Sequence, residues 1–420
     1  MAKTKTGENL DSQLLYAIFT PALQKGYAQF AIRKTAPRPM PGGLTPADLN
    51  YLDPASKLFH IPATLYSVGQ FSFNQMEKPP ACMVTRRDKP KTLILGDSGG
   101  YQILKGKLDV QSDNEREKIF NWLEVNTDFA MTLDVPTAYA EDYGEFKKCL
   151  TKTKKHLKYW NKRYPNGQGQ GNFLLVLQGG EEAWITEWDD YVTNDSYSGY
   201  AVAGKKKKSL YVVLKRLLKL YHQSKLGKKL FWVHFLGVSD LTTACLLTAM
   251  RDEIRELLGD DGFHISLDAS NPFLMAGRYN EIYTGYEIKR SGLVMPTERI
   301  EARWKHVNSD EPVSFADQSP IAKHLTMGDL VLKRPKNKER KYGLDTTALH
   351  MITNHNIYVH VKGVIEANKK FKMPYQRAKE YFPQAMLTAK SAMAEIVRHE
   401  QPFDCLEKHK ELLIRASKPS

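Results

Sequence analysis

The sequence predicts an α/β fold, a TIM-like (β/α)8 barrel followed by a C-terminal helical appendage. Three observations predict it: short apolar runs recur along the chain, each run ends on a polar residue or glycine, and helical patterns lie between most of the runs. Such runs are typical of parallel strands covered on both faces, and their alternation with helices is typical of a barrel. The six clearest runs are TLILGDSGG (92–100), DFAMTLDVP (128–136), NFLLVLQGG (172–180), GYAVAG (199–204), FWVHFLGVS (231–239) and FHISLDASN (263–271).

Two further strands are needed before residue 92 to complete a barrel. We assign them to YAQFAIR (27–33) and IPATLYSV (61–68), which are rich in β-branched and aromatic residues. A doubly wound open sheet is the alternative fold, but no GxGxxG motif follows a first strand in this chain. The barrel is therefore the favoured prediction.

The segments between the runs have the apolar spacing of amphipathic helices. In 209–223, leucines and valines recur at helical spacing with lysines between them. The alternation of strands and helices weakens after the sixth run, and helical sequence returns in 346–371 and 374–400. We therefore divide the chain into a catalytic barrel with an N-terminal extension (1–290) and a region of a basic loop and C-terminal helices (291–420).

The charge of the chain is strongly positive and unevenly placed. Its 61 Lys and Arg outnumber 47 Asp and Glu, giving a net charge of +14 and a pI near 9.3. The basic residues are concentrated in 147–164, 204–229 and 332–341. Such clustering predicts a polyanionic partner, and nucleic acid is the leading candidate. Solvated helix faces are the alternative interpretation.

Hydropathy and cysteine spacing argue against a membrane protein, a secreted protein, a disulfide framework and a zinc knuckle. No apolar run reaches 18 residues, and the N-terminus lacks an apolar signal segment, so we expect a soluble, cytoplasmic protein with no membrane partner. The cysteines form no CxxC pair, so we expect neither a disulfide framework nor a zinc knuckle, but buried reduced thiols. The four cysteines are Cys82, Cys149, Cys245 and Cys405.

Polar residues at the ends of the predicted strands indicate the chemistry. The carboxyl ends of barrel strands surround one pocket, which would collect Asp97, Asp134, Gln178, Gly199 and Asp268. Carboxylates without a metal-ligand cluster suggest nucleophilic and acid/base work on an acetal-like carbon, such as a glycosidic carbon. Each Asp taken alone is better explained as a helix cap. Three acids and a QGG segment at equivalent strand ends favour a shared site.

Six motifs together resemble the guanine transglycosylases, which exchange guanine in nucleic acid for a 7-deazaguanine. They occur in the family's order, and the similarity covers roughly residues 90–290. The segment HMITNHNIYVHV (350–361) is similar to a helix with a His-Asn pair near the family's C-terminal end. The six motifs are DSGGYQ (97–102), LDVPT (133–137), LQGG (177–180), GYAVAG (199–204), VHFLGVS (233–239) and LDAS (267–270).

The resemblance implies a role for each matching residue. Asp268 would be the nucleophile that bonds to C1′, and Asp97 the acid that protonates the departing guanine and the base that deprotonates the incoming one. The purine would be read by the side chains of Asp134 and Gln178 and by the Gly199 N–H. The remaining expected contacts are Gly179 beside the base, Tyr101 and Leu236 on its two faces, and Lys205, Lys206, Lys207 and Lys208 on phosphates.

Two departures from the family's pattern narrow the range of expected substrates. Members that act on tRNA carry a zinc site of three cysteines and a histidine before the His-Asn helix, and this chain has KNKERKYGLDTTALH there. We expect no metal and no cofactor, because a substitute set of His350, His355, Cys405 and His409 is weakly supported by spacing. Members that take an aminomethyl-deazaguanine have a glutamate that aligns with Gly204, so an uncharged substituent such as the nitrile of 7-cyano-7-deazaguanine is favoured.

We therefore expect a DNA-guanine transglycosylase, a pentosyltransferase of the kind that modifies bacteriophage and bacterial DNA. Its partners would be DNA and a free 7-deazaguanine, in a bacterial or phage-infected cell. A divergent tRNA-guanine transglycosylase is the nearest alternative, followed by a non-catalytic nucleic-acid-binding partner subunit. An unrelated carboxylate glycosidase on the same barrel is a third. The sequence leaves open whether the chain forms a homodimer.

Overall fold

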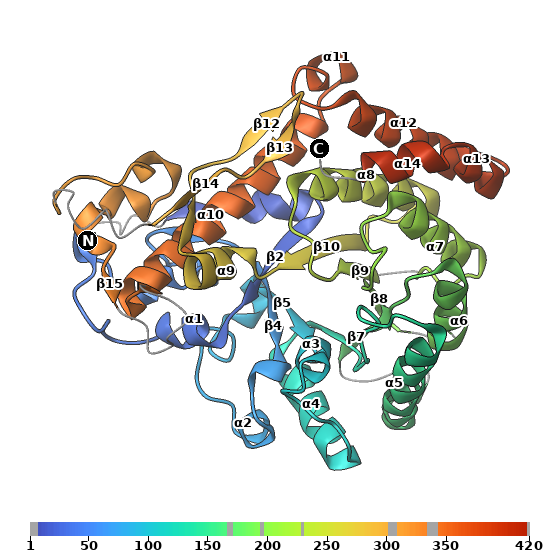
Figure 1. Cartoon of the computed structure of the whole chain (residues 1–420), viewed down its shortest axis with the longest axis horizontal. Coiled ribbons are helices and arrows are strands. Elements are labelled where there is room, and N and C mark those ends of the chain that lie inside the picture. Colours follow the sequence, from blue (N-terminus) through green and yellow to red (C-terminus); the bar gives the residue numbers. More distant parts are fainter. Residues whose placement is uncertain are drawn as a thin grey trace.

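The computed structural model describes residues 7–165, 171–193, 197–227, 231–300, 309–333 and 343–417. Eight parallel strands form a closed barrel in the order β10-β2-β4-β5-β6-β7-β8-β9, and helices surround it (Figure 1). The predicted (β/α)8 barrel with C-terminal helices is confirmed. The barrel strands are β2 (Ile18–Leu23), β4 (Ala63–Ser67), β5 (Leu93–Asp97), β6 (Phe129–Met131), β7 (Asn172–Leu177), β8 (Gly199–Val202), β9 (Phe231–Phe235) and β10 (Phe263–Ala269).

Seven of the eight barrel strands lie in the predicted segments, and the first does not. The segment 27–33 was predicted as a strand, but most of it belongs to helix α1 (Lys25–Phe30). The first barrel strand is instead IFTPAL, which contains Pro21. Proline lacks the N–H that a central strand needs, which hides this strand from pattern analysis. The Pro21 carbonyl oxygen still forms a hydrogen bond to the neighbouring strand, because Thr64 Oγ1 donates to it at 2.6 Å.

Four of the described α-helices begin at side chains that cap the first turn through a hydrogen bond. Ser112 accepts the Glu115 N–H at 3.2 Å, and Asp240 accepts the Thr243 N–H at 2.8 Å, so both satisfy backbone donors of the first turn. The remaining helices are α2 (Phe73–Glu77), α3 (Gly100–Leu104), α4 (Asp113–Asn126), α5 (Tyr143–Arg163), α6 (Glu182–Val192), α7 (Leu210–His222), α8 (Leu241–Leu258), α9 (Asn271–Leu274), α10 (Thr346–Phe371), α11 (Tyr375–Ala378), α12 (Gln384–Arg398), α13 (Pro402–Lys408) and α14 (Lys410–Ala416).

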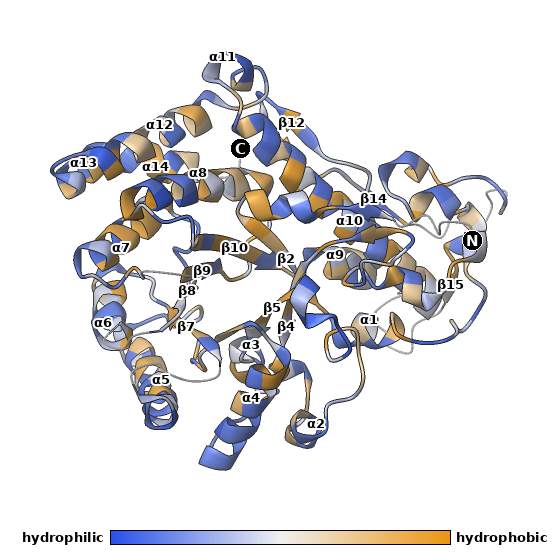
Figure 2. Cartoon of the chain, turned by 180° about the vertical axis from the view of Figure 1, so that it is seen from behind, coloured by the Kyte–Doolittle hydropathy of each residue, from blue (hydrophilic) through white to orange (hydrophobic). Residues whose placement is uncertain are grey.

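The core has two layers, one inside the barrel and one between the strands and the helices. Figure 2 shows apolar strands at the centre and hydrophilic outer faces on α4 and α5. The outer layer includes β2, where the Phe19 ring stacks on His360 of α10 at 4.2 Å. The inner layer consists of Ile18, Ala63, Leu65, Leu95, Phe129, Met131, Leu174, Val176, Ala201, Ala203 and Trp232.

The C-terminal helices pack directly on the barrel. Helix α10 contacts α8 and β2, and its buried side chains belong to the same core as the outer faces of the strands. Helix α12 lies on α8, and α13 and α14 contact α7 (Figure 1). Along the sequence, four short strands lie between β10 and α10. Strand β11 (Glu281–Tyr283) pairs with β14 (Thr297–Arg299), and β12 (Glu287–Lys289) pairs with β13 (Gly292–Val294). The predicted division at residue 290 falls in the turn between β12 and β13.

Several other expectations concern single segments. Most of the predicted basic loop (332–341) lies outside the described residues. Within the described ranges, no helix combines the length and apolarity needed to cross a membrane. All four cysteines are unpaired, and three are buried as predicted, whereas Cys149 is half-buried. Its Sγ contacts the Pro136 carbonyl oxygen at 3.7 Å.

Candidate active site

Four predicted polar residues lie together at the carboxyl ends of the barrel strands. Asp97 ends β5, Asp268 lies near the end of β10, and Gln178 follows β7 directly. Asp134 follows β6 and is bonded to Gln178, while the charge of Asp268 acts on Asp97 and that of Asp97 acts on Asp134. The closed barrel therefore gathers these groups as the sequence predicted, because parallel strands end on one face.

Asp268 is held by one of its two carboxylate oxygens. Its Oδ1 accepts the Gly237 N–H at 2.8 Å and lies 3.2 Å from Nε2 of His234. The Nδ1 of His234 lies 2.7 Å from Ser266 Oγ, which also accepts the Trp232 indole N–H at 2.6 Å. In a neutral His234 imidazole, this series of hydrogen bonds places the proton on Nε2, which donates to Asp268. Both donors act on Oδ1, which leaves Oδ2 as the oxygen available for nucleophilic attack.

Asp97 has the protonation behaviour of a general acid. Burial raises the pKa of its carboxyl group, and the negative charge of Asp268 raises it further. Contacts with Ser67, the Gly99 N–H and His234 act in the opposite direction. A carboxyl group with a raised pKa holds its proton up to a higher pH than a free carboxyl group, which favours general-acid chemistry.

Asp134 and Gln178 form a buried hydrogen-bonded pair. Gln178 Nε2 donates to Asp134 Oδ2 at 2.7 Å, and Thr137 Oγ1 donates to Gln178 Oε1 at 3.3 Å. Burial raises the pKa of Asp134 to about 7, with a smaller contribution from the charge of Asp97. The Arg216 guanidinium donates to the Gln178 carbonyl oxygen at 3.0 Å and is itself paired with buried Asp189. The pair is thus rigidly placed and presents both a carboxyl group and an amide.

Glycines let the backbone approach this pair closely. A Cβ at Gly100 would lie 3.0 Å from Asp134 Oδ1. Gly204 has φ +87°, and a Cβ there would lie 2.5 Å from the Gly179 carbonyl oxygen and 3.4 Å from Gln178 Oε1. Side chains at these positions would fill the space in front of the carboxyl and amide groups.

Gly199 does not lie in this site, which corrects the prediction. It is the first residue of β8 and pairs with Leu174 and Trp232, both at or near the amino ends of their strands. The polar site is at the opposite end of the barrel, since β8 runs from Gly199 to Val202. Gly204 instead has the place beside Gln178 that we expected of Gly199.

Tyr101 and Leu236 border the site. Leu236 is half-buried, packs against the inner layer of the barrel, and precedes the Gly237 N–H that binds Asp268. Tyr101 is 60% exposed on α3, and the Lys105 ammonium lies 5.6 Å from its ring centre. Tyr101 thus belongs to the open rim of the site, and Leu236 to its wall.

The four lysines after β8 do not act alike. Lys205 Nζ donates to the Ala140 carbonyl oxygen at 3.0 Å, and Lys208 is paired with Asp240 at 2.7 Å. Lys206 is exposed. Lys207 is half-buried and close to the site: a Cβ at Gly237 would lie 2.9 Å from its Nζ. Burial lowers the pKa of Lys207, and the charge of Asp268 opposes that shift.

Sequence reasoning missed His234 and Thr137, although both lie within quoted motifs, and it assigned Lys207 to phosphates without finding its place beside Gly237. The signal for His234 was an imidazole inside an otherwise apolar strand, FWVHF. A buried polar group of this kind needs partners, and the only polar residues at matching register are on neighbouring β10. Thr137 and Lys207 depend on loop conformation, which the sequence pattern does not encode.

Polar residues of α10 position the loops around the site. Asn356 Oδ1 accepts the Tyr283 N–H at 3.0 Å, and its Nδ2 donates to the Glu281 carbonyl oxygen at 3.2 Å. His360 Nε2 bonds to the Ser239 carbonyl oxygen at 2.8 Å, just beyond the β9 loop that holds Asp268. The segment 350–361 is thus a structural support for the active-site end of the barrel.

The substitute zinc set weighed from the sequence is not assembled. His350 packs between the rings of Tyr27 and Phe30. His355 bonds to Ser319 Oγ and to the Tyr283 carbonyl oxygen, both at 2.7 Å. Cys405 and His409 do lie close together, but on the far C-terminal helices.

The chain matches no protein-family model, and a comparison with curated proteins gives no significant match. The arrangement itself can perform carboxylate chemistry. It offers a carboxylate held through one of its oxygens, a carboxyl group with a raised pKa, and a hydrogen-bonded carboxyl–amide pair beside them.

Proposed function

We propose that this protein is a DNA-guanine transglycosylase that exchanges guanine in DNA for a 7-deazaguanine. The observation that carries the proposal is the coupling of Asp97 with Asp268, with the Asp134–Gln178 pair beside them. Exchange of a base needs a nucleophile for C1′, an acid for the leaving base and a reader for the purine edge. The motif resemblance to guanine transglycosylases supplies the same three roles for the same residues.

In the first half-reaction, Asp268 Oδ2 attacks C1′ of the deoxyribose and the C1′–N9 bond breaks. The electron pair of that bond goes to N9 of guanine, and the proton of Asp97 moves to the purine. The products are a covalent aspartyl-glycosyl ester and free guanine, with Asp97 now ionised. His234 and the Gly237 N–H hold Oδ1 and so orient Oδ2 for the attack.

In the second half-reaction, the incoming 7-deazaguanine gives its N9 proton to Asp97. The N9 electron pair then attacks C1′, and the ester bond to Asp268 breaks, which restores the carboxylate. Asp97 has regained the proton that it lost, so the cycle closes without a cofactor or a redox step. The raised pKa of Asp97 suits both proton transfers.

The Asp134–Gln178 pair suits the edge of guanine. An ionised Asp134 accepts hydrogen bonds from N1–H and the 2-amino group, while the Gln178 amide donates to O6. Adenine has an acceptor at N1 and an amino group at position 6, so it would oppose both contacts. The glycines at positions 100 and 204 leave room for a flat ring against the pair.

The rim of the barrel mouth suits a nucleic acid. Exposed tyrosines alternate with lysines there: Lys105 lies 5.0 Å from the ring centre of Tyr139, and Lys147 lies 5.5 Å from that of Tyr143. Aromatic faces stack on bases, and ammonium groups contact phosphates. The outer face of α5 adds five exposed lysines that form no ion pair with a described residue: Lys148, Lys152, Lys155, Lys158 and Lys162.

Incorporation of labelled base into duplex DNA and into tRNA, compared side by side, tests the proposal. We expect labelled guanine and 7-cyano-7-deazaguanine to enter DNA with the wild-type protein. Asp97→Asn should slow the exchange by at least about a hundredfold, because no proton reaches the leaving base. Asp190→Asn, a change on the exposed face of α6, is the matched control. Label that enters only tRNA would assign the same chemistry to the alternative substrate, and label in neither would contradict the proposal.

The affinity for free guanine should fall on acidification. The pKa of Asp134 is raised to about 7, so its carboxyl group takes up a proton below neutral pH and can no longer accept from N1–H. Between pH 8 and pH 6 the dissociation constant should rise about tenfold. Calorimetric titration measures it without catalysis, and Asp134→Asn should bind weakly with no such dependence. A constant affinity across this range would remove Asp134 from the base-reading role.

A further inference from the structure

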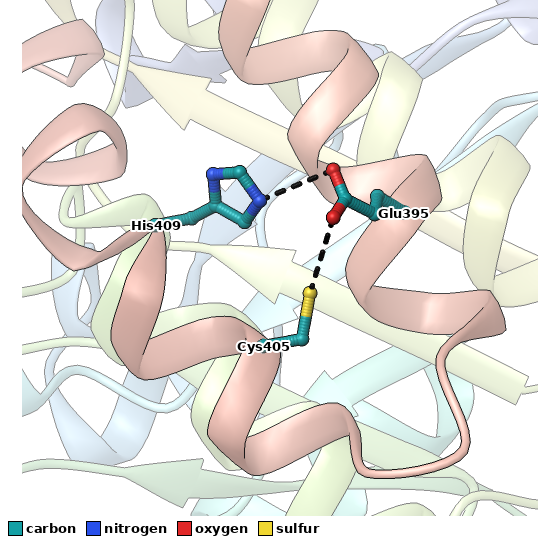
Figure 3. A group of neighbouring side chains, drawn as sticks. All are labelled: Glu395, Cys405 and His409. Carbon is teal, nitrogen blue, oxygen red and sulfur yellow. Dashed lines mark hydrogen bonds and ion pairs between the residues drawn. The ribbon is translucent and has the colours of Figure 1, made fainter.

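Three potential metal ligands meet on the C-terminal helices, far from the barrel mouth. Glu395 lies on α12, Cys405 on α13, and His409 between α13 and α14. One ligand atom of each lies within 4.8 Å of the other two. Figure 3 shows the imidazole of His409 and the thiol of Cys405 both pointing at the carboxylate of Glu395.

The spacing of the ligand atoms fits tetrahedral zinc. Zinc bond lengths imply about 3.4 Å between nitrogen and oxygen ligands and about 3.6 Å between sulfur and oxygen ligands. The corresponding distances are 3.2 Å from His409 Nε2 to Glu395 Oε2 and 3.8 Å from Cys405 Sγ to Glu395 Oε1. These two contacts end on different oxygens of the Glu395 carboxylate, and a small rotation of that side chain would bring one oxygen, the sulfur and the nitrogen onto one ion.

The surroundings also favour a metal over a simple hydrogen-bonded cluster. A thiol is a weak donor, so the Cys405–Glu395 contact alone gains little. Cys405 is buried, whereas the side chains of Glu395 and His409 are 59% and 26% exposed. The inner side of the cluster is thus closed by protein, and the outer side is open to a water molecule as fourth ligand. A thiolate, an imidazole and a carboxylate together are a donor set that zinc takes readily.

We propose that Glu395, Cys405 and His409 form a zinc site that joins α12 to the α13–α14 corner. On binding, the Cys405 thiol loses its proton to solvent and the thiolate, the His409 imidazole and the Glu395 carboxylate bond to Zn²⁺. Helix α12 packs on α8, and α14 packs on α7, so the ion ties together helices that cover two neighbouring parts of the barrel. The site is separate from the proposed base-exchange chemistry.

Zinc content after chelator treatment, reloading with Zn²⁺ and dialysis tests the site. The wild-type protein should retain about one equivalent, and Cys405→Ser and His409→Gln should lose it, since each change removes one of only three protein ligands. Cys149→Ser is the matched control, because that thiol lies on α5 and belongs to no group of potential metal ligands among the residues that the structure describes. Failure of the wild type to retain zinc, or equal retention by both site variants, would overturn the proposal.

Cobalt substitution and thermal unfolding give independent readouts. Co²⁺ in the wild-type site should show a thiolate charge-transfer band that Cys405→Ser lacks. Added Zn²⁺ should raise the unfolding temperature of the wild type and of Cys149→Ser, because a ligand of the native state stabilises it. The unfolding temperature of His409→Gln, whose side chain is partly exposed, should not respond to zinc. A zinc-induced rise in His409→Gln equal to that of the wild type would contradict the site.

Discussion

Replacing the proposed nucleophile, in Asp268→Asn, should lower base exchange by at least about a thousandfold and abolish a covalent protein–DNA adduct. Asparagine has nearly the same shape and can still accept the Gly237 N–H, so the barrel should fold normally. Its amide oxygen is too weak a nucleophile to displace guanine from C1′. Denaturing electrophoresis of protein mixed with labelled DNA measures the adduct, and circular dichroism checks the fold.

A substrate with a better leaving group separates Asp268 from Asp97. 7-Methylguanine in DNA carries a positive charge and departs as a neutral base, so its departure needs no proton from an acid. Asp97→Asn should therefore regain adduct formation on DNA that contains 7-methylguanine, whereas Asp268→Asn should not. Adduct formation by Asp268→Asn on either DNA would show that another group attacks C1′.

Introducing a methyl group at Gly199 should destabilise the fold and leave the chemistry of the folded fraction intact. A Cβ there would lie 1.8 Å from the Trp232 carbonyl oxygen, and φ is +150°, so Gly199→Ala combines a steric clash with backbone strain. We expect a loss of about 3 kcal/mol in the free energy of unfolding. Denaturant unfolding followed by tryptophan fluorescence measures it.

Two other glycine variants serve as controls for Gly199→Ala. Gly259→Ala changes a residue with φ +62° at the end of α8 and meets no atom within 4 Å, so it should cost only about 1 kcal/mol. Gly204→Ala should instead weaken guanine binding, because its Cβ would crowd Gln178 and Gly179. A stable Gly199→Ala protein that fails to bind guanine would return Gly199 to the base-reading site.

The fold could be predicted where buried strands are continuous and apolar, as in β7 and β10, because burial on both faces fixes their composition. The first strand could not, since Pro21 interrupts its pattern and the chain reverses into α1 within a few residues. Pattern alone does not distinguish a short apolar helix such as 25–30 from a strand. The long-range pairing of β2 with β10, which the sequence pattern does not show, makes residues 18–23 the first barrel strand.

The site could be predicted where it follows directly from strand ends. Asp97, Gln178 and Asp268 follow this rule, because a parallel barrel places all carboxyl ends on one face. The rule failed for GYAVAG, which has a glycine at each end, and only the length of β8 shows that the second glycine reaches the site. The roles of Lys205, Lys207 and Lys208 depend on contacts with distant loops, which a run of identical residues cannot reveal.

The closure of the barrel has a consequence for how the chain folds during synthesis. Strand β2, near the N-terminus, pairs with β10, and α10 covers that seam through the Phe19–His360 stack. The Asn354 amide donates to the Tyr27 hydroxyl across 327 residues of sequence. Contacts between such distant segments slow folding, because a long loop must close before they form. The first strand therefore leaves the ribosome long before β10 and α10, and a chain that stops before α10 would expose the seam to aggregation.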